Sequence, residues 1–293
     1  MTLRSLTCTQ VALADRARGE NFTVASRVLP RSVRLHLLGF YAFARFVDEI
    51  GDAYEGDRLA ALDEVENQTR AALHDPDLVG ALPVVATAAR SVSELDADPS
   101  LLFDLIAANR QDQTVSAYDT FNDLLAYCAL SANPVGRLVL AAFRASREAL
   151  FAWSDSICTG LQLAEHWQDV AEDAAAGRVY LPREDLAQFG VEPAALTAGP
   201  PASRALRALS VFEVARARGY LDRGQPLIGA LDGSARWAVA GFWAGGHATL
   251  DGIAQRGFDV LAGTPHRSRL RTVTRAMTLV IAAHRAQPGE MVA

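Results

Sequence analysis

Apolar residues recur at spacings of three and four along most of the chain, whereas alternating runs of β-branched residues between turn residues are scarce. The first pattern is typical of amphipathic helices and the second of strands, so the sequence predicts an all-α protein. The pattern predicts long helices at about 32–53, 58–74, 83–94, 100–113, 118–132, 135–151, 154–176, 202–223, 235–262 and 267–286.

The breaks between these helices are short and consist of Pro, Gly, Asn or Asp, as at Asp75-Pro76 and Asn133-Pro134. None is long enough, or biased enough in composition, to be a linker between domains, and no repeat of 20–50 residues is visible. The sequence therefore predicts a single helical domain over residues 1–293.

Composition narrows the function classes. The 28 basic residues are all Arg and the net charge is −6, so nucleic acid is not an expected partner, because phosphate contacts supply most of that affinity. Three cysteines in no CxxC pattern indicate neither a disulfide framework nor a structural zinc site. Without a signal peptide or a run of about 20 apolar residues, we expect a soluble cytoplasmic protein, with loose attachment to a membrane surface left open.

The frame Asp-x-x-x-Asp occurs twice, each time after an apolar run: Asp48 with Asp52, and Asp169 with Asp173. Residues four apart on a helix project from one face, with Cβ atoms about 5–6 Å apart, and like charges placed in this way repel each other. A solvated helix face would be the default explanation for a single frame. A pair at the end of a buried stripe instead points into or above a cavity, and Arg45 lies one turn before the first frame.

If the two acidic helices face each other, four to six carboxylate oxygens converge, and hard cations such as Mg²⁺ take oxygen ligands. Glu165, one turn before Asp169, lies on the same helix face and is a candidate fifth ligand, and Mn²⁺ is an alternative ion. Such a site suits a diphosphate, whose charge must be neutralised before its C–O bond ionises. The resulting carbocation needs an apolar, aromatic-walled pocket that keeps water away.

Four segments carry a resemblance beyond these spacings: NFTVASRVLP, YAFARFVDEIGD, YCALSANPVGRLVL and QLAEHWQDVAEDAAAGRVYLPREDL. Together they resemble the squalene/phytoene synthase family of head-to-head prenyl synthases. The segments occur in the family's order and cover most of residues 20–190, whereas the rest of the chain matches only loosely. The fourth segment is the most specific, because it joins an Asp-x-x-x-Asp frame to Gly-Arg-Val-Tyr-Leu-Pro at a fixed offset.

The resemblance implies one all-α isoprenoid-synthase domain with a central active-site cavity. It implies four Mg²⁺ ligands, namely Asp48, Asp52, Asp169 and Asp173. It also implies substrate-binding positions, with arginines on the diphosphate and other side chains along the pocket: Arg45, Arg178, Tyr41, Phe22, Tyr127 and Gln162.

Some synthases of this family join two prenyl diphosphates in two steps. The chain differs from these two-step synthases at several positions, and the differences remove positive charges and a catalytic group. Glu20 and Asn21 stand where those enzymes have a basic residue and a Ser. Leu130 replaces a Tyr, Gln168 replaces an Arg, and Glu165 replaces an Asn. Two positive charges and a catalytic phenol are thereby lost. A pocket that holds two diphosphates would be weakened by these exchanges, because unpaired phosphate oxygens are costly.

The strings Glu20–Phe22 and Ser131–Gly136 instead resemble the bacterial hydroxysqualene synthase subgroup. By that resemblance the substrate is presqualene diphosphate, and water captures the rearranged cation to give hydroxysqualene and pyrophosphate. Asn133, Glu165 and His166 are polar groups in places where that water could be held, and Asn133 therefore joins the aspartates as a candidate catalytic residue. The alternatives are that Asn133 caps a helix and that His166 is a core histidine.

No GxGxxG follows a predicted strand, so we expect no dinucleotide fold and no use of NADPH. The implied substrate would come from a presqualene diphosphate synthase, which makes functional coupling to that enzyme an expectation. Two other functions stay open. One is a full squalene, dehydrosqualene or phytoene synthase that recruits arginines from Arg267 to Arg271, and the other is a non-catalytic helical homologue.

Overall fold

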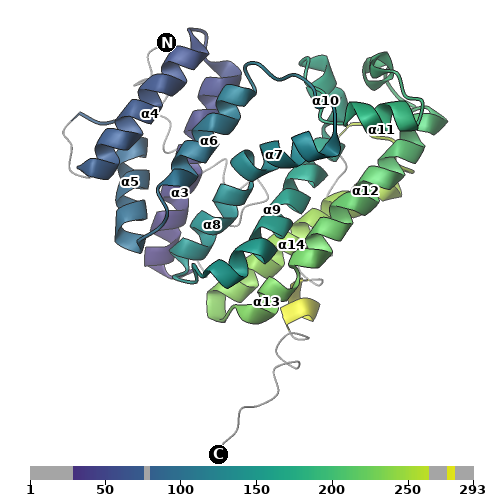
Figure 1. The fold of residues 1–293 in the computed structure, drawn as a ribbon. Coiled ribbons are helices and arrows are strands. Elements are labelled where there is room, and N and C mark those ends of the chain that lie inside the picture. Colours follow the sequence, from purple (N-terminus) through teal and green to yellow (C-terminus); the bar gives the residue numbers. More distant parts are fainter. Residues whose placement is uncertain (1–28, 76–79, 264–275, 281–293) are drawn as a thin grey trace, which may run out of the picture. The chain divides into compact units, whose positions relative to one another are not determined.

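The computed structural model describes residues 29–75, 80–263 and 276–280. Helices make up the regular structure of this part of the chain, and the β-type pairing described is an isolated bridge between Ala117 and Val179. In chain order (Figure 1) the elements are α3 (Arg31–Ala53), α4 (Arg58–His74), α5 (Pro83–Leu95), α6 (Ser100–Gln111), α7 (Phe121–Ser131), α8 (Asn133–Ala142), α9 (Glu148–Gln168), α10 (Val170–Ala175), α11 (Arg183–Gln188), the 3₁₀ helix η2 (Pro193–Thr197), α12 (Arg204–Gly224), α13 (Pro226–Ala230) and α14 (Gly233–Gln255).

The chain forms two compact units. The first unit comprises Met1–Val115 and Ala129–Glu148, and the second comprises Ser116–Cys128 and Ala149–Ala293. The expected single domain over residues 1–293 stays a prediction.

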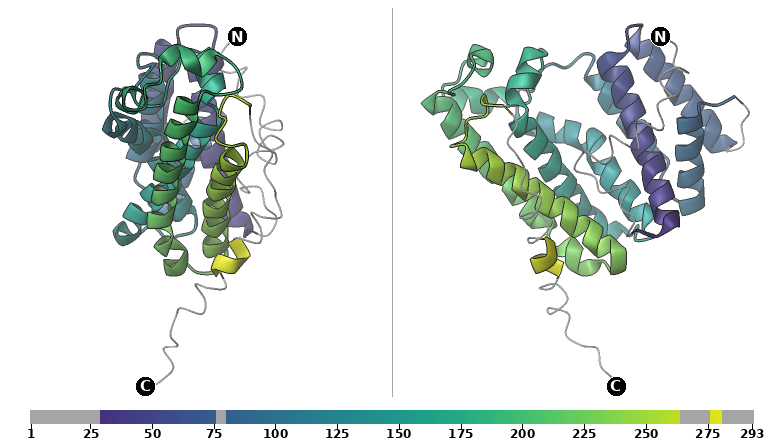
Figure 2. Two further views of the ribbon diagram at one scale, coloured as in Figure 1. Left: turned by 90° about the vertical axis from the view of Figure 1, so that its right-hand side faces the viewer. Right: turned by 180° about the vertical axis from the view of Figure 1, so that it is seen from behind.

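In the first unit, α3 is the central helix and packs against α4, α5, α6 and α8. Figure 2 shows α3, α4 and α5 running side by side. The buried apolar side chains of α3 recur at spacings of three and four, which places them on one stripe: Leu37, Phe40, Phe43, Phe46, Val47 and Ile50. Burial of this stripe supplies the main stabilisation of α3, because helix propensity alone is weak in water.

In the second unit, α12 and α14 run side by side, as both views in Figure 2 show. Small residues allow close packing here. A Cβ atom at Gly160 of α9 would lie 2.9 Å from the backbone nitrogen of Leu221, and one at Gly246 of α14 would lie 2.8 Å from Cδ2 of Leu161. The indole of Trp243 donates a hydrogen bond to the Leu221 carbonyl at 2.9 Å and so ties α14 to α12.

The structure corrects several predicted helix boundaries. The helix expected at 135–151 is wrong, because α8 ends at Ala142, Arg144 takes a φ of 53°, and α9 begins at Glu148. The helix expected at 235–262 ends early at Gln255, where Gly257 and Phe258 both adopt positive φ. Short helices that the periodicity did not predict are α11, η2 and α13. The helix expected at 267–286 lies mostly outside the described residues.

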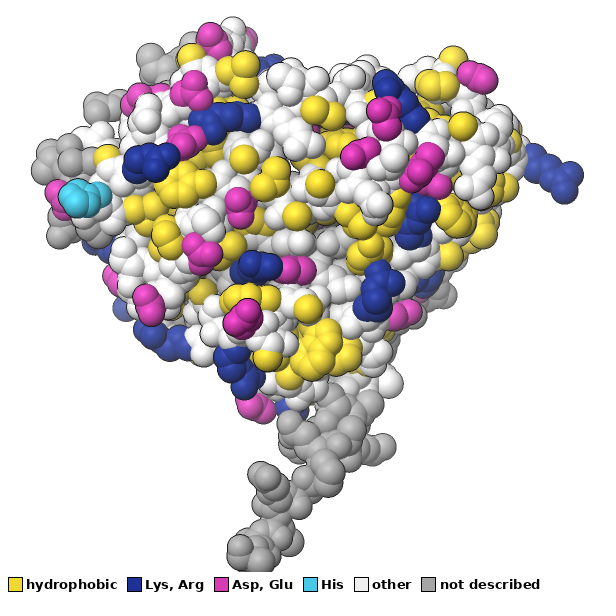
Figure 3. Space-filling view, viewed as in Figure 1, with side chains coloured by type: hydrophobic (Ala, Val, Ile, Leu, Met, Phe, Trp, Pro, Cys, Tyr) yellow, Lys and Arg dark blue, Asp and Glu magenta, His cyan; other side chains and the backbone are white. Residues whose placement is uncertain are grey.

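One helical stretch in the described residues, Phe121–Ala142, is long and apolar enough to span a bilayer by length and composition. However, 56% of its apolar window is buried inside the protein, and core helices of soluble proteins pass the same test. On the face drawn in Figure 3, arginine and acidic side chains lie interspersed among apolar and neutral ones.

A buried charge cluster joins α11 to α12. The Arg216 guanidinium donates to the Asp185 carboxylate at 2.7 Å and to the Glu213 carboxylate at 3.1 Å, and it lies over the ring of Phe121 with 4.0 Å to the ring centroid. Both carboxylates are almost fully buried. Burial raises the pKa of Glu213 to about 8 despite the nearby Arg216, and Asp185 raises this pKa further.

The raised pKa of Glu213 predicts a pH dependence of stability. Because the folded protein retains a proton that the unfolded chain releases, the Glu213 contribution to the free energy of unfolding should fall as pH rises from about 4.5 to about 8. The variant Glu213→Gln mimics the protonated side chain and should lack this fall. Chemical denaturation of both proteins between pH 5 and pH 8.5 would measure the difference, and a difference that stays constant with pH would contradict the prediction.

The close packing of α9 against α12 predicts the effect of a substitution on stability. Gly160→Ala should lower the free energy of unfolding by about 1–3 kcal/mol, because the added methyl group meets backbone atoms of α12. Gly245→Ala in α14 is the matched control, since no atom lies within 4 Å of its added Cβ. That control should be neutral or stabilising by up to about 1 kcal/mol, because alanine favours helix. Equal effects of the two substitutions in thermal denaturation would disprove the packing argument.

Candidate functional site: two acidic frames

The first acidic frame lies at the end of α3, where it overlaps the last residues of the buried stripe. Tyr41, Arg45, Asp48 and Asp52 follow one another at spacings of four, three and four, which places them on one helix face. Asp48 is half-buried and Asp52 is exposed. The Arg45 guanidinium lies 3.8 Å from Oδ2 of Asp48, and these side chains are 35% and 41% exposed. An ion pair this exposed contributes little to stability.

Helix α6 supports the first frame through two amide side chains. Nδ2 of Asn109 donates a hydrogen bond to Oδ1 of Asp48 at 3.1 Å. Nε2 of Gln113, just after α6, donates to the Gly51 carbonyl at 3.1 Å. The last carbonyls of a helix have no partner within the helix, and Gln113 satisfies one of them. Arg58 satisfies another, because its Nη2 donates to the Asp52 carbonyl at 2.9 Å.

The second acidic frame lies at a break between helices. The predicted helix 154–176 begins instead at Glu148, and it is interrupted at Asp169, which has φ −105° and ψ 15° between α9 and α10. The one-turn spacing nevertheless survives, because the Asp173 amide donates to the Asp169 carbonyl at 2.9 Å. Asp169 and Asp173 therefore still lie one turn apart, and both are partly exposed.

The residues around the second frame divide into exposed and buried groups. Glu165, the candidate fifth ligand, is exposed. Gln168 is buried, and its Nε2 donates to Oδ1 of Asp169 at 2.9 Å. The amide of Gln162 lies 3.2 Å from Nε2 of His166, which is also buried.

Four rings form an aromatic cluster in the second unit: Tyr118, Tyr127, His166 and Tyr180. The imidazole of His166 stacks on the ring of Tyr180 with centroids 3.7 Å apart. Tyr127 lies 5.8 Å from Tyr180 and 5.6 Å from Tyr118, centroid to centroid. Burial lowers the pKa of His166 to about 3, and Arg178 adds to this shift, so the ring is neutral near pH 7. His166 is thus a core residue of this cluster.

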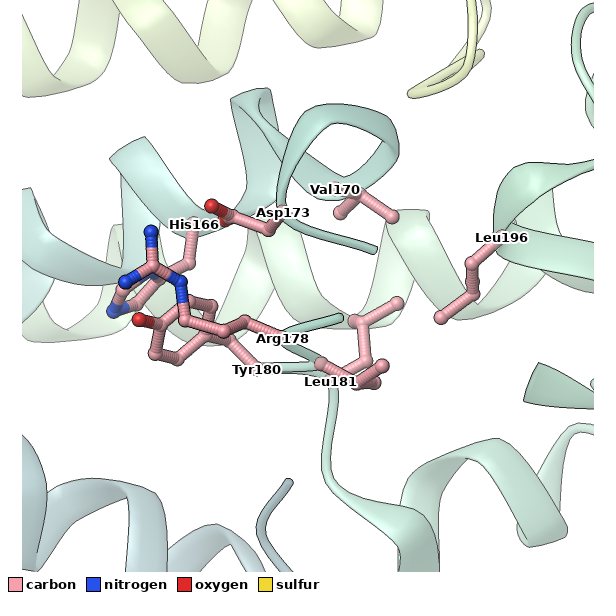
Figure 4. Close-up of a pocket in the computed structure, with 8 residues that line it drawn as sticks. His166, Val170, Asp173, Arg178, Tyr180, Leu181 and Leu196 are labelled. Carbon is pink, nitrogen blue, oxygen red and sulfur yellow. The ribbon is translucent and has the colours of Figure 1, made fainter. Parts of the chain in front are cut away.

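The segment after α10 brings the cluster next to the second frame. The Arg178 amide donates to the Asp173 carbonyl at 2.8 Å, and the Val179 amide donates to the Ser116 carbonyl at 2.8 Å. A small cavity of about 10 Å³ lies here, with room for a single water molecule. Figure 4 shows that Asp173, Arg178, His166 and Tyr180 lie on one side of it and apolar side chains on the other.

The structure thus groups the predicted site residues within each unit. Those in the first unit are Tyr41, Arg45, Asp48, Asp52 and Asn133. Those in the second are Tyr127, Gln162, Glu165, Asp169, Asp173 and Arg178. Phe22 lies outside the described residues. Asn133 does not cap a helix, because it is already the first residue of α8, and the residue before it, Ala132, is the N-cap.

The donor chemistry of the frames fits Mg²⁺ or Mn²⁺, since both frames present partly exposed carboxylates and no competing thiol lies on either. Among the described residues, no group of three or more His, Cys, Asp or Glu side chains is placed to hold a metal ion by itself. Each frame offers two carboxylates.

Sequence reasoning missed four residues that contribute to these arrangements: Asn109, Gln113, Tyr118 and Tyr180. Tyr180 belongs to the Gly-Arg-Val-Tyr-Leu-Pro string and could have been found from it. Asn109 carried no local signal, because its partner Asp48 is 61 residues away in the chain.

Comparison with known proteins places the chain among enzymes of isoprenoid chemistry. Hydroxysqualene synthase from Rhodopseudomonas palustris is 35% identical over 222 residues, which cover 72% of this chain and 70% of that protein. Hydroxysqualene synthase from Zymomonas mobilis is 34% identical over 176 residues, which cover 58% of this chain and 57% of that protein. Phytoene synthase from Arthrospira platensis also matches, with 28% identity over 92% of this chain and 89% of its own length.

The fold agrees with these matches. A crystal structure of a squalene synthase from Alicyclobacillus acidocaldarius superposes with a TM-score of 0.78 and 36% sequence identity, covering 88% of this chain and 96% of that one. The predicted all-α fold of the isoprenoid-synthase type is therefore confirmed. The family model described as squalene/phytoene synthase matches residues 15–274. The chain belongs to the squalene/phytoene synthase family, whose members process prenyl diphosphates.

Proposed function

We propose that the protein is a hydroxysqualene synthase, which converts presqualene diphosphate and water to hydroxysqualene and diphosphate. Relatives with that name at 34% and 35% identity support the reaction. The structural observation that best supports this function is the uncharged aromatic cluster beside the second frame. An uncharged aromatic cluster beside Asp173 and Arg178 suits a site where a cation forms, because buried His166 adds no positive charge there.

In the proposed reaction the leaving group is diphosphate, and the charged residues of the site would bind it directly or through metal ions. Asp48, Asp52, Asp169 and Asp173 would together hold Mg²⁺, or Mn²⁺ in its place, with Glu165 as a further ligand. When bound, the ions neutralise the diphosphate and so assist ionisation of its C–O bond. Arginines can bind phosphate oxygens through two parallel hydrogen bonds, which is the role proposed for Arg45 and Arg178.

The chemistry then balances without a redox cofactor. The C–O bond breaks and the diphosphate leaves with the electron pair, which gives a cyclopropylcarbinyl cation. After rearrangement, the oxygen of a water molecule bonds to the cation and releases a proton. Asn133 and Glu165 are the candidates to hold that water, because His166 is buried in the aromatic cluster.

The place of the protein in a reaction sequence follows from its substrate. Presqualene diphosphate must be supplied by an enzyme that condenses two farnesyl diphosphates, so we propose functional coupling to such a synthase. A cytoplasmic protein that is soluble or attached loosely to the membrane surface could receive an apolar substrate of this kind. NADPH has no role in the proposed reaction.

The proposed function predicts a product pattern. With presqualene diphosphate and Mg²⁺, mass spectrometry should detect hydroxysqualene and equimolar pyrophosphate, and added NADPH should change neither. Steady product formation from farnesyl diphosphate alone would instead establish a full head-to-head synthase. Absence of turnover with both substrates would favour a non-catalytic homologue.

The proposed metal set predicts the effect of single substitutions. Asp48→Ala and Asp173→Ala should each lower turnover by a factor of about 10²–10³, because the diphosphate loses ions that stabilise its charge in the transition state. The helical circular dichroism signal should hardly change, since both side chains are partly exposed. Glu49→Gln and Glu172→Gln are matched controls in the same helical turns and should retain activity. Full activity of either aspartate variant would refute the metal model.

A further inference from the structure

The amide of Asn109 has a fixed orientation next to the first frame. Its Nδ2 makes both contacts that an amide nitrogen can make with its two N–H groups: it donates to Oδ1 of Asp48 at 3.1 Å and to the Leu105 carbonyl at 3.2 Å. The residue is 8% exposed, so water does not replace these contacts. A flipped amide would place its oxygen against two acceptors, and the nitrogen therefore faces Asp48.

Gly51 provides the space that Asn109 occupies. A Cβ atom on Gly51 would lie closer to Oδ1 of Asn109 than real Cβ contacts allow. Glycine in a helix is less favourable than alanine, so its presence in α3 has a stability cost. Gln113 strengthens the same junction, because its Nε2 donates to the carbonyls of Gly51 and Asn109 at 3.1 and 3.0 Å. Both side chain and backbone of α3 are thus held from α6.

We propose that Asn109 is a positioning residue for the first acidic frame, which orients Asp48 toward the divalent cation of a diphosphate substrate. This inference rests on the proposed function. The final torsion of an aspartate side chain is broad, so a carboxylate without a fixed donor samples many orientations. The hydrogen bond to Oδ1 restricts the orientation of the carboxylate.

A neutral amide suits this task better than a cation. It orients the carboxylate while the full negative charge stays available to the metal, whereas a buried arginine would compete with the metal for that charge. Arg45 cannot fix the carboxylate in the same way, because its guanidinium lies 3.8 Å from Oδ2 and both side chains are about a third or more exposed. Groups that orient metal ligands typically change metal affinity by a factor of about 10–100 when they are replaced.

The test measures Mn²⁺ binding by electron paramagnetic resonance in the presence of inorganic pyrophosphate, together with the Mg²⁺ dependence of turnover. Asn109→Leu and Asn109→Ala should raise the dissociation constant for Mn²⁺ by a factor of about 10–100 and raise the half-saturating Mg²⁺ concentration in parallel. Turnover at saturating Mg²⁺ should change much less. Asn67→Ala, an exposed amide of α4 in the same unit, is the control and should alter neither value.

A substitution at Gly51 provides a second, independent test of the positioning role. Gly51→Ala should weaken Mn²⁺ binding as much as Asn109→Ala does, because the new methyl group displaces the amide. The double variant should show no further loss, since truncation of Asn109 removes the side chain that the new methyl group would strike. Substitutions of contacting residues are non-additive in this way. Thermal denaturation of each variant separates this effect from unfolding.

The outcomes of these experiments distinguish the positioning role of Asn109 from the proposed function of the protein. Mn²⁺ affinity equal to that of the unmodified protein in folded Asn109→Leu and Asn109→Ala would overturn the positioning role alone. A lowered melting temperature without a change in Mn²⁺ affinity would also overturn it, because Asn109 would then be structural only. Failure of the unmodified protein to bind Mn²⁺ with pyrophosphate would overturn the proposed function as well.

Discussion

Both acidic frames place two carboxylates one helical turn apart, and the repulsion between these carboxylates must be offset by other contacts. Asp48 with Asp52, and Asp169 with Asp173, place like charges close together on one face, which destabilises a helix unless something offsets it. The first aspartate of each frame receives a hydrogen bond from a neutral amide: Asn109 donates to Asp48, and Gln168 donates to Asp169. Both donors are uncharged amides, which suits the proposed role of these carboxylates as metal ligands.

The second unit shows how burial determines charge near the proposed chemistry. Burial lowers the pKa of His166 and raises that of Glu213, so both side chains are mainly uncharged near neutral pH. Tyr180 is stacked on the neutral His166, and both lie beside Arg178 and Asp173, the charged groups of the second frame. An aromatic, uncharged cluster directly beside charged groups suits the proposed reaction, which separates an anionic leaving group from a carbocation.

Much of the fold could be predicted from the sequence, because long helices repeat their apolar positions many times. The periodicity placed α4 within its observed bounds and α3 within one residue. The breaks at Arg144 and Asp169 were missed for a physical reason. Neither position carries Gly or Pro, and Arg144 adopts its positive φ in the folded context. Asn109 was missed because its role depends on a contact across 61 residues and on the missing Cβ of Gly51, which no local pattern reveals.

By the resemblance, Gln168 stands where the two-step synthases carry Arg, and this position bears on the proposal of one diphosphate rather than two. An arginine there would bring a positive charge beside Asp169, whereas the buried amide of Gln168 donates its hydrogen bond to that carboxylate and adds no charge. Each diphosphate in a site needs cations to balance several negative oxygens, and unbalanced buried charge is costly. A second frame with its first carboxylate oriented by a neutral group can still hold metal ions for one diphosphate. Gln168 supplies no cation for a second diphosphate, which agrees with the proposed single leaving group.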